Sequence, residues 1–338
     1  MFAWHQGVNY WHFACRQPMM AGIMRNRDTL KYLAAVILFG SNGVVASRIA
    51  MSSYDIVLTR TLIGALFLAA VFLSSRAKPT CWRDKRHFVF LLASGVAMGA
   101  SWLFLFEAYT QVGVSVATLA YYCGPVIVMV LAPVVFRERL AVSSVIGFLA
   151  VVVGMLCVNG QALVAGQASS GLIFGVLAAV AYSAMVILNK KAGSITGLEN
   201  PMWQLIAAFG TVAVFVVLKQ GFTIHVPPGS WAPVLVLGLL NTGVGCYLYF
   251  SSIGGMRAQS VAILGYLEPL SALLFAAAFL GESLRPIQAV GATLILGGAV
   301  LGELLRQRVI TTKRIQADGA PPGWDEGQRR QGAPPLMR

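Results

Sequence analysis

Ten apolar stretches take up most of this chain, and its charged residues fall mainly in the short connections between them. Each stretch holds about 20 residues, and an α-helix of that length rises about 30 Å, enough to cross the hydrocarbon core of a bilayer. The runs are continuous and lack the period-two alternation of membrane strands. The pattern therefore predicts an all-α integral membrane protein with ten transmembrane helices. They cover residues 31–50, 55–75, 87–109, 114–136, 142–163, 171–190, 201–219, 231–253, 260–281 and 286–306.

The last five stretches repeat the first five at a constant offset of 144 residues. Glycine and aliphatic matches alone occur by chance in membrane helices, but this offset also aligns a Tyr, a Pro and a Glu. Because each half has an odd number of spans, the two halves must lie upside down relative to each other. The sequence therefore predicts two inverted five-helix repeats, residues 31–163 and 171–306, an architecture that recurs in secondary transporters. The aligned pairs include Tyr122 with Tyr266, Pro125 with Pro269, Glu138 with Glu282, Gly147 with Gly291 and Gly154 with Gly298.

The placement of charge predicts the orientation. The chain has 338 residues, of which 57% are hydrophobic and 11% charged, and its net charge is +13. A soluble domain has about 25% charged residues. With the N-terminus inside, 21 of the 25 Lys and Arg residues fall on the cytoplasmic side and three on the outer side, as the positive-inside rule describes. We expect a multi-pass protein of the cell membrane with both termini in the cytoplasm, and no nucleic-acid partner.

Two terminal segments lie outside the predicted repeats. Residues 1–30 lack the apolar core and cleavage site of a signal peptide, so they are predicted to be a cytoplasmic leader, or to reflect a start codon placed too early. Residues 307–338 are rich in Arg, Gln, Gly and Pro and are predicted to be a disordered cytoplasmic tail. The five cysteines show no CxxC spacing and no pair on the outer side, so neither a disulfide nor a metal site is expected.

A motif in the ninth stretch resembles a known family. The run Tyr-Leu-Glu-Pro-Leu at 266–270, followed by Gly281-Glu282 and by Gln288-x-x-Gly291-Ala292, is similar to the EamA family of the drug/metabolite transporter superfamily. The resemblance covers about residues 30–306. It implies a ten-helix transporter that works by alternating access, with a central cavity lined mainly by the first four helices of each half. One departure is that Glu268 aligns with Gly124, so a pair of symmetric acids is absent.

Glu268 is the leading candidate for a functional residue. A charged group near the middle of a membrane helix costs about 2.5–3.5 kcal/mol by insertion scales, so it needs a reason to be there. Pro269 beside it removes a backbone donor and frees a carbonyl one turn earlier. A carboxylate in this setting is suited to bind a cationic group or to exchange a proton. The alternative is a structural Glu that is hydrogen-bonded to a neighbouring helix.

Two further charged groups lie near the predicted outer side. Glu107 is close to the outer end of the third stretch, where its side chain either serves transport or snorkels to the interface. Arg60 lies one turn into the second stretch, and we expect a structural pair with Asp55 or snorkelling.

Uncharged polar and aromatic residues also fall within the spans. The aromatic ones suggest a lining for an amphipathic solute, whereas the two asparagines either line the cavity or hold helices together. These candidates are Asn42, Trp102, Tyr121, Tyr122, Tyr182, Asn241 and Tyr247. Glycines with helical spacing predict close helix packing, as outer braces of the fold or as a homodimer contact. These are Gly147, Gly154, Gly291, Gly298 and Gly302.

No enzyme motif occurs: the chain has no phosphate loop, no HExxH and no GxSxG. No cofactor is predicted. The sequence favours a secondary transporter that exports small organic metabolites or drugs, with proton coupling as the expected energy source. A non-transporting membrane receptor or assembly partner is the alternative.

Overall fold

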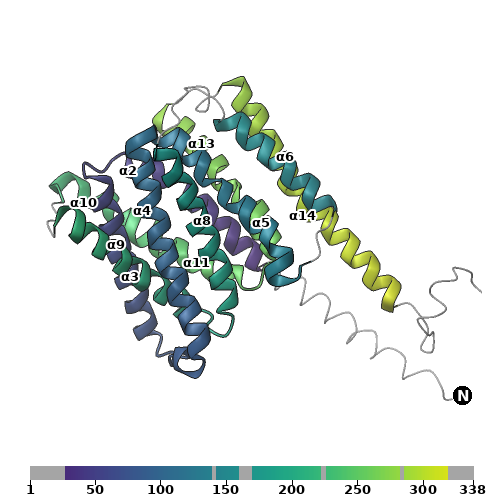
Figure 1. Ribbon diagram of the computed structural model, residues 1–338, viewed down its shortest axis with the longest axis horizontal. Helices are drawn as coiled ribbons and strands as arrows, with labels where there is room; N and C mark the ends of the chain where they lie inside the picture. Colours follow the sequence, from purple (N-terminus) through teal and green to yellow (C-terminus); the bar gives the residue numbers. More distant parts are fainter. Residues whose placement is uncertain (1–26, 139–141, 160–169, 222–225, 282–284, 319–338) are drawn as a thin grey trace, which may run out of the picture.

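The computed structural model describes residues 27–138, 142–159, 170–221, 226–281 and 285–318. Every regular element within these ranges is a helix (Figure 1). The elements are a helix at 27–40, α2 (Asn42–Ala46), α3 (Ser53–Ser74), η1 (Cys81–Arg83), α4 (Lys85–Tyr121), α5 (Cys123–Phe136), α6 (Val142–Asn159), α8 (Ser170–Lys191), α9 (Glu199–Gln220), η2 (Pro228–Ser230), α10 (Trp231–Leu235), η3 (Val236–Val244), α11 (Gly245–Ile253), α12 (Ala258–Gly265), α13 (Leu267–Leu280) and α14 (Pro286–Asp318).

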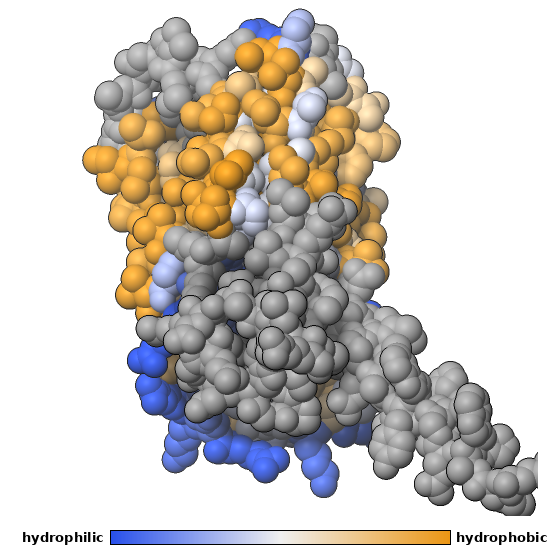
Figure 2. All heavy atoms as spheres, turned by 90° about the vertical axis from the view of Figure 1, so that its right-hand side faces the viewer, coloured by the Kyte–Doolittle hydropathy of each residue, from blue (hydrophilic) through white to orange (hydrophobic). Residues whose placement is uncertain are grey.

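Seven helical segments in the described part of the chain are long and apolar enough to cross a membrane. Three further apolar helices are shorter, at 123–136, 142–157 and 286–302. Large hydrophobic side chains remain exposed on many of them, such as Val134 at 79% and Leu218 at 82%. Figure 2 shows hydrophobic residues over the upper part of the visible face and hydrophilic residues gathered at its lower end. These features are those of an integral membrane protein, in which lipid covers the apolar surface.

Helix α4 reverses direction, although its backbone is helical throughout. Ser94 and Ser101 donate hydrogen bonds to the carbonyls of Met185 and Ala178, so this part of α4 runs antiparallel to α8. Further along α4, the Thr118 hydroxyl lies 3.3 Å from the Tyr109 hydroxyl, nine residues back, which a straight helix with a rise of about 1.5 Å per residue does not bring together. The turn falls where the sequence predicts the connection between the third and fourth stretches.

Two helix breaks occur at equivalent positions of the predicted repeats. Tyr122 separates α4 from α5, and Tyr266 separates α12 from α13, with nearly the same backbone angles (φ −72°, ψ 1° and φ −71°, ψ −5°). A proline follows three residues after each tyrosine. Because proline cannot donate to the carbonyl four residues earlier, it favours a break at this point.

Contacts across the molecule also follow the 144-residue offset. Helices α3 and α9 occupy equivalent positions and pack against each other, while α3 packs on η3 and α9 on α4. Likewise, α5 packs on α8, and its counterpart α13 packs on α2. The Tyr266 hydroxyl donates to the carbonyl of Tyr122 at 2.7 Å. Two of these contacts therefore have a counterpart in the other half: α3 on η3 matches α9 on α4, and α5 on α8 matches α13 on α2.

Helices α6 and α14 form a pair that stands apart from the other helices (Figure 1). A Cβ at Gly147 would lie 2.5 Å from the carbonyl oxygen of Gly298 and 2.6 Å from the Cα of Gly302, and one at Gly154 would lie 2.6 Å from the carbonyl oxygen of Gly291. The two helices are therefore antiparallel and in backbone contact. These glycines pack two helices of one chain together, which uses the surface that a dimer contact through the same glycines would need.

Helix α14 continues to Asp318, although a disordered tail was expected from residue 307. Residues 307–318 contain no Gly or Pro, whereas Gly319, Pro321 and Pro322 follow directly. Overall composition misled the prediction, because the helix-breaking residues are concentrated after position 318. Residues 1–26, most of the predicted leader, and residues 319–338 lie outside the described ranges.

Candidate functional site

Glu268 lies in the first turn of α13, directly after the break at Tyr266, and its side chain is half buried. The Arg60 guanidinium, from α3, is close enough for the two charges to interact. The phenol groups of five tyrosines, from three helices and the break between α4 and α5, also lie within the range of the Glu268 charge. They are Tyr32, Tyr109, Tyr121, Tyr122 and Tyr182.

The Glu268 carboxylate has no hydrogen bond to any residue in the described part of the chain, although its backbone carbonyl accepts from Ser271. A structural glutamate within a membrane is expected to be hydrogen-bonded, because an unpaired charge is costly there. The arrangement therefore leaves the acceptor capacity of this carboxylate unused by the described protein groups.

Arg60 is the second charged group of the site, and the expected pair with Asp55 is wrong. Its guanidinium carbon lies 4.4 Å from the centre of the Trp102 ring, an arrangement in which a cation is attracted to the ring face. Its Nε is buried and has no hydrogen-bond partner among the described residues. Asp55 instead accepts hydrogen bonds from Ser52 and Gln220. Five residues along a helix correspond to about 140° of rotation, so Asp55 and Arg60 face different directions.

Tyrosine rings form a connected cluster beside these charges. Tyr121 packs edge-to-face on Tyr182 with a centroid distance of 5.5 Å, and the Tyr182 hydroxyl lies 3.2 Å from that of Tyr249. Tyr249 in turn packs on Tyr32 at 5.2 Å. Tyr122 joins the cluster through Tyr121 at 5.6 Å. Aromatic faces combined with phenol hydroxyls suit a solute with both apolar and polar parts.

The first membrane helix is interrupted close to the π-helix η3. Asn241, on η3, donates hydrogen bonds to the carbonyl of Leu38 and to the hydroxyl of Ser41, at 2.9 and 2.8 Å. The helix at 27–40 ends there and α2 begins at Asn42, whose buried Oδ1 has no partner in the described structure. Asn241 therefore bridges two helices, whereas Asn42 offers a free acceptor. π-helical turns often occur at functional sites.

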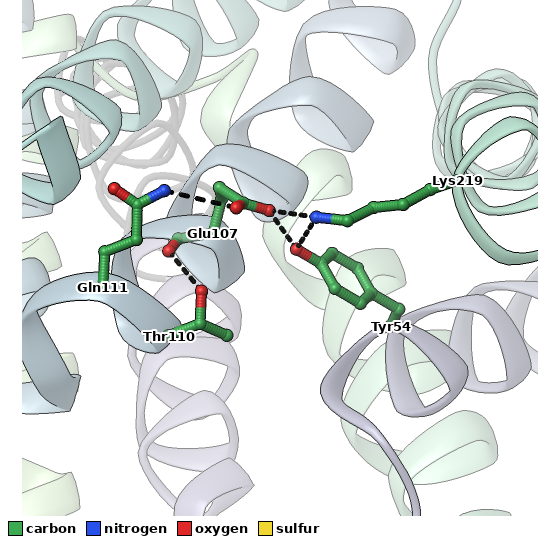
Figure 3. Close-up of polar contacts among 5 residues, drawn as sticks. All are labelled: Tyr54, Glu107, Thr110, Gln111 and Lys219. Carbon is green, nitrogen blue, oxygen red and sulfur yellow. Dashed lines mark hydrogen bonds and ion pairs between the residues drawn. The ribbon is translucent and has the colours of Figure 1, made fainter.

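Within the described ranges, the remaining sequence candidates, Glu107 and Tyr247, have no hydrogen bond or ring contact to Glu268 or to the tyrosine cluster. Glu107 accepts hydrogen bonds from Tyr54, from Lys219 at 2.5 Å and from Gln111 at 3.2 Å (Figure 3). It therefore belongs to a separate network that joins α3, α4 and α9. Tyr247 is half buried against the main hydrophobic core, and in the described ranges it has no hydrogen bond or ring contact to the other candidates.

Sequence reasoning missed two members of the site and misjudged a third. Tyr32, near the start of the first span, and Tyr109, in the third, were not proposed as candidates, whereas Tyr249 was noticed among the polar residues within the eighth span. Arg60 was interpreted as a structural partner of Asp55 or as an interface residue. The signal for Arg60 was available, because an arginine within an apolar stretch is as costly as the glutamate that was noticed.

Comparison with known proteins identifies similar chains. A sequence model of the EamA-like transporter family matches residues 29–160 and, separately, residues 169–302. The chain is 26% identical to an uncharacterized transporter, YxxF, of Bacillus subtilis (strain 168), over 86% of this chain and 94% of that protein. It is also 26% identical to a probable amino-acid metabolite efflux pump of Salmonella typhimurium, over 86% of this chain and 99% of the pump.

Two further similarities have either a shorter aligned length or a lower sequence identity. The chain is 30% identical to the aromatic amino acid exporter YddG of Ancylobacter novellus over 136 residues, which is 39% of this chain and 46% of that exporter. A solved crystal structure superposes with a TM-score of 0.71 at 20% identity, over 82% of this chain and 98% of the other. This last similarity concerns the fold alone.

Proposed function

We propose that this chain, which belongs to the EamA-like transporter family, is a secondary transporter that exports small zwitterionic organic solutes across the cell membrane by alternating access. The observation that carries the proposal is the pair of incompletely partnered charges, Glu268 and Arg60, beside a cluster of tyrosines. An acid and a base that face one aromatic cluster complement a solute with an ammonium group, a carboxylate and an apolar part.

Each part of the solute has a stated partner in this proposal. The carboxylate binds the Arg60 guanidinium, whose planar donors match a carboxylate. The ammonium group binds Glu268, and the apolar part packs on the rings of Tyr121 and Tyr182. Two relatives whose names refer to amino-acid metabolites and to aromatic amino acids support this solute class.

The proposed mechanism uses two inverted halves. The paired contacts at the 144-residue offset and the double match of the family model support this arrangement. Elements of both halves surround Glu268: Arg60 and Tyr122 come from the first, and Tyr182 from the second. Rocking of one half against the other then exposes the site to one side at a time.

A set of hydrogen bonds on the predicted cytoplasmic side is suited to keep the site closed on that side during part of the cycle. Glu138, in the first half, accepts hydrogen bonds from the N–H groups of Ala258 and Gln259 at 2.9 and 3.4 Å. Lys190 donates to the carbonyls of Ile253, at 3.0 Å, and of Met256. These bonds tie the connection between α11 and α12 to α8 and to the residue two positions after α5. In the proposed cycle they break when the site opens to the cytoplasm.

Proton coupling completes the proposal and assigns a second role to Glu268. A carboxylate that takes up a proton from outside loses its attraction for the solute ammonium group and releases it. The deprotonated carboxylate then binds a new solute from the cytoplasm. Export of the solute is thereby coupled to import of a proton at one residue.

Counterflow in proteoliposomes tests the solute class. Vesicles that contain purified protein are loaded with an unlabelled compound, and uptake of radiolabelled phenylalanine or leucine is measured without an ion gradient. We expect exchange with zwitterions that carry an apolar side chain. Phenethylamine lacks the carboxylate and phenylpropionate lacks the amine, so each is expected to exchange at least about tenfold more weakly because one charge is left unpaired. Equal exchange of all three would contradict the zwitterion proposal, and no exchange of any solute together with one-sided cysteine labelling would favour a receptor.

A further inference from the structure

A lateral cavity lies between α4, α8 and α9, away from Glu268. Its volume is about 720 Å³, and its walls are almost entirely apolar. Leu103 and Phe104 line it from α4, Phe174 from α8, and Val214, Phe215 and Leu218 from α9. Val214 and Leu218 are 62% and 82% exposed on the apolar surface of the protein. The cavity therefore opens towards the lipid.

One end of this cavity is charged. Glu107 and Lys219 line it and form an ion pair of 2.5 Å, and the Tyr54 hydroxyl contacts both (Figure 3). The side chains of Lys219 and Glu107 remain 41% and 22% exposed. The lining extends from Glu107 back to Ala100 on α4 and from Lys219 back to Thr211 on α9, which corresponds to about 10–12 Å of helix. An acid and a base thus stand at the head of an apolar groove that runs into the membrane.

We infer that this groove is a specific binding site for a zwitterionic phospholipid with a primary ammonium group, of the phosphatidylethanolamine type. One acyl chain lies along the apolar walls, the phosphate binds Lys219, and the ammonium group donates to Glu107. The ion pair carries no net charge, so a zwitterionic headgroup complements it better than a purely anionic one. The site lies on the side that the charge distribution predicts to face outward, and it does not depend on the solute that the chain transports.

The primary ammonium group determines the selectivity. An ethanolamine nitrogen carries three N–H donors and can bind a carboxylate that already accepts from Tyr54, Lys219 and Gln111. A choline nitrogen carries three methyl groups and has no donor, and a glycerol headgroup has no positive charge to set against Glu107. Because a hydrogen bond to a charged group contributes about 1.5–3 kcal/mol, we expect at least about tenfold tighter binding of the ethanolamine lipid.

Photolabelling tests this inference. The full-length protein is reconstituted in phosphatidylcholine vesicles with a trace of phosphatidylethanolamine that carries a diazirine on its acyl chain. After illumination, labelled residues are mapped by mass spectrometry. We expect labelling of Leu103, Phe104 and Val214, which unlabelled phosphatidylethanolamine suppresses at about one tenth of the added concentration needed for phosphatidylglycerol. Additional phosphatidylcholine is expected to suppress it no better than phosphatidylglycerol does.

Two pairs of variants separate the acyl chain from the headgroup. Thr211→Trp fills the groove and is expected to abolish the labelling, whereas Val130→Trp, at a position 65% exposed on α5, is expected to leave it unchanged. The double variant Glu107→Gln with Lys219→Gln keeps the groove but removes both charges. It is expected to keep the labelling and lose the preference among headgroups, and it remains informative if Thr211→Trp fails to fold.

Three results would overturn the inference. Equal suppression by all three lipids would mean that any acyl chain fills the groove. Uniform labelling of all lipid-facing helices would mean that no site exists there. Suppression by a transported zwitterion, and not by phosphatidylethanolamine, would assign the groove to lateral entry of the solute.

Discussion

Two glutamates within the helical bundle differ in the hydrogen bonding of their carboxylates. The difference distinguishes a polar side chain that stabilises the fold from one that is available for function. Glu199, at the start of α9, is 4% exposed, and its carboxylate accepts hydrogen bonds from the Thr80 N–H, the Thr80 hydroxyl and the Cys81 N–H. It therefore fixes the connection between α3 and α4. Glu268 is half buried, and no group within the described ranges hydrogen-bonds to its carboxylate. Buried charge that is fully bonded stabilises a fold, whereas charge that lacks such partners is available to a ligand or a proton.

The same contrast holds for the uncharged neighbours of each glutamate. Near Glu199, Gln204 donates to Ser94 at 2.7 Å, and Asn189 donates to Asn200 and Gln204 at 2.9 and 3.1 Å. This network joins α4, α8 and α9. Near Glu268, Arg60 has a buried atom without a described partner. The buried Nε1 of Trp203 also has no described hydrogen-bond partner. A buried atom without a partner is therefore not enough to identify a functional site. The charge of Arg60 and its proximity to Glu268 make the difference.

The largest effect is expected from Arg60→Gln. Loss of the guanidinium removes the proposed partner of the solute carboxylate, so transport is expected to fall by about 100-fold, the equivalent of about 3 kcal/mol. Stability is expected to change little, because Nε has no described hydrogen bond to lose, and the loss of the Trp102 contact is offset by removal of the desolvation cost of the cation. Counterflow and thermal unfolding of the same preparation measure both quantities. A large drop in the unfolding temperature would instead make Arg60 a structural residue.

A smaller effect, on stability alone, is expected from Gln204→Leu. The change removes the hydrogen bonds of Gln204 to Ser94 and Asn189, which keep their bonds to Met185 and Asn200. It is expected to cost about 1–2 kcal/mol, as for other buried polar contacts between membrane helices. The transport rate per folded molecule is expected to stay the same. Gln220→Leu is the matched control on the same helix, because the bond of Gln220 to Asp55 is exposed; its expected cost is below about 0.5 kcal/mol. A Gln204→Leu protein that is stable but inactive would contradict the distinction between a structural network at Glu199 and a functional site at Glu268.

The smallest effects are expected at the interrupted first helix, where one asparagine is hydrogen-bonded to its neighbours and another has an acceptor without a described partner. Asn241→Ala removes two interhelical hydrogen bonds and is expected to cost about 0.6–1.7 kcal/mol of stability. Asn42→Ala removes an acceptor with no described partner, so its stability is expected to be unchanged and its solute affinity to fall several-fold. Thermal unfolding and counterflow half-saturation distinguish the two. Equal loss of stability in both variants would place Asn42 with the structural residues.

Much of the helical framework could be predicted from the sequence, for local reasons. Apolar runs of bilayer length mark the helices, and the tyrosine-to-proline spacing marks both breaks, because the missing N–H of proline acts on its own helix. The reversal within α4 and the length of α14 could also be read from local residues, although composition over a wide window obscured the second.

The membership of the site could be predicted only in part. Glu268 and Tyr182 could be identified because polar groups in a membrane are costly. The ring contact between Tyr32 and Tyr249, in contrast, joins residues more than 200 positions apart in the chain. Such contacts arise from the docking of helices and carry no local pattern. The Glu107 network could not be foreseen for the same reason, since Lys219 lies 112 residues away.

The most direct test of the account compares Glu268→Gln with Glu199→Gln in proteoliposomes, with proton-driven transport, counterflow and thermal unfolding measured for each. Glutamine keeps the shape of both side chains but cannot exchange a proton. Glu268→Gln is expected to stay folded, to lose proton-driven transport with a flattened pH dependence, and to retain part of its counterflow. Glu199→Gln is expected to unfold at a lower temperature and to transport normally while folded. A Glu268→Gln protein that transports at the normal rate with an unchanged pH profile would contradict the account.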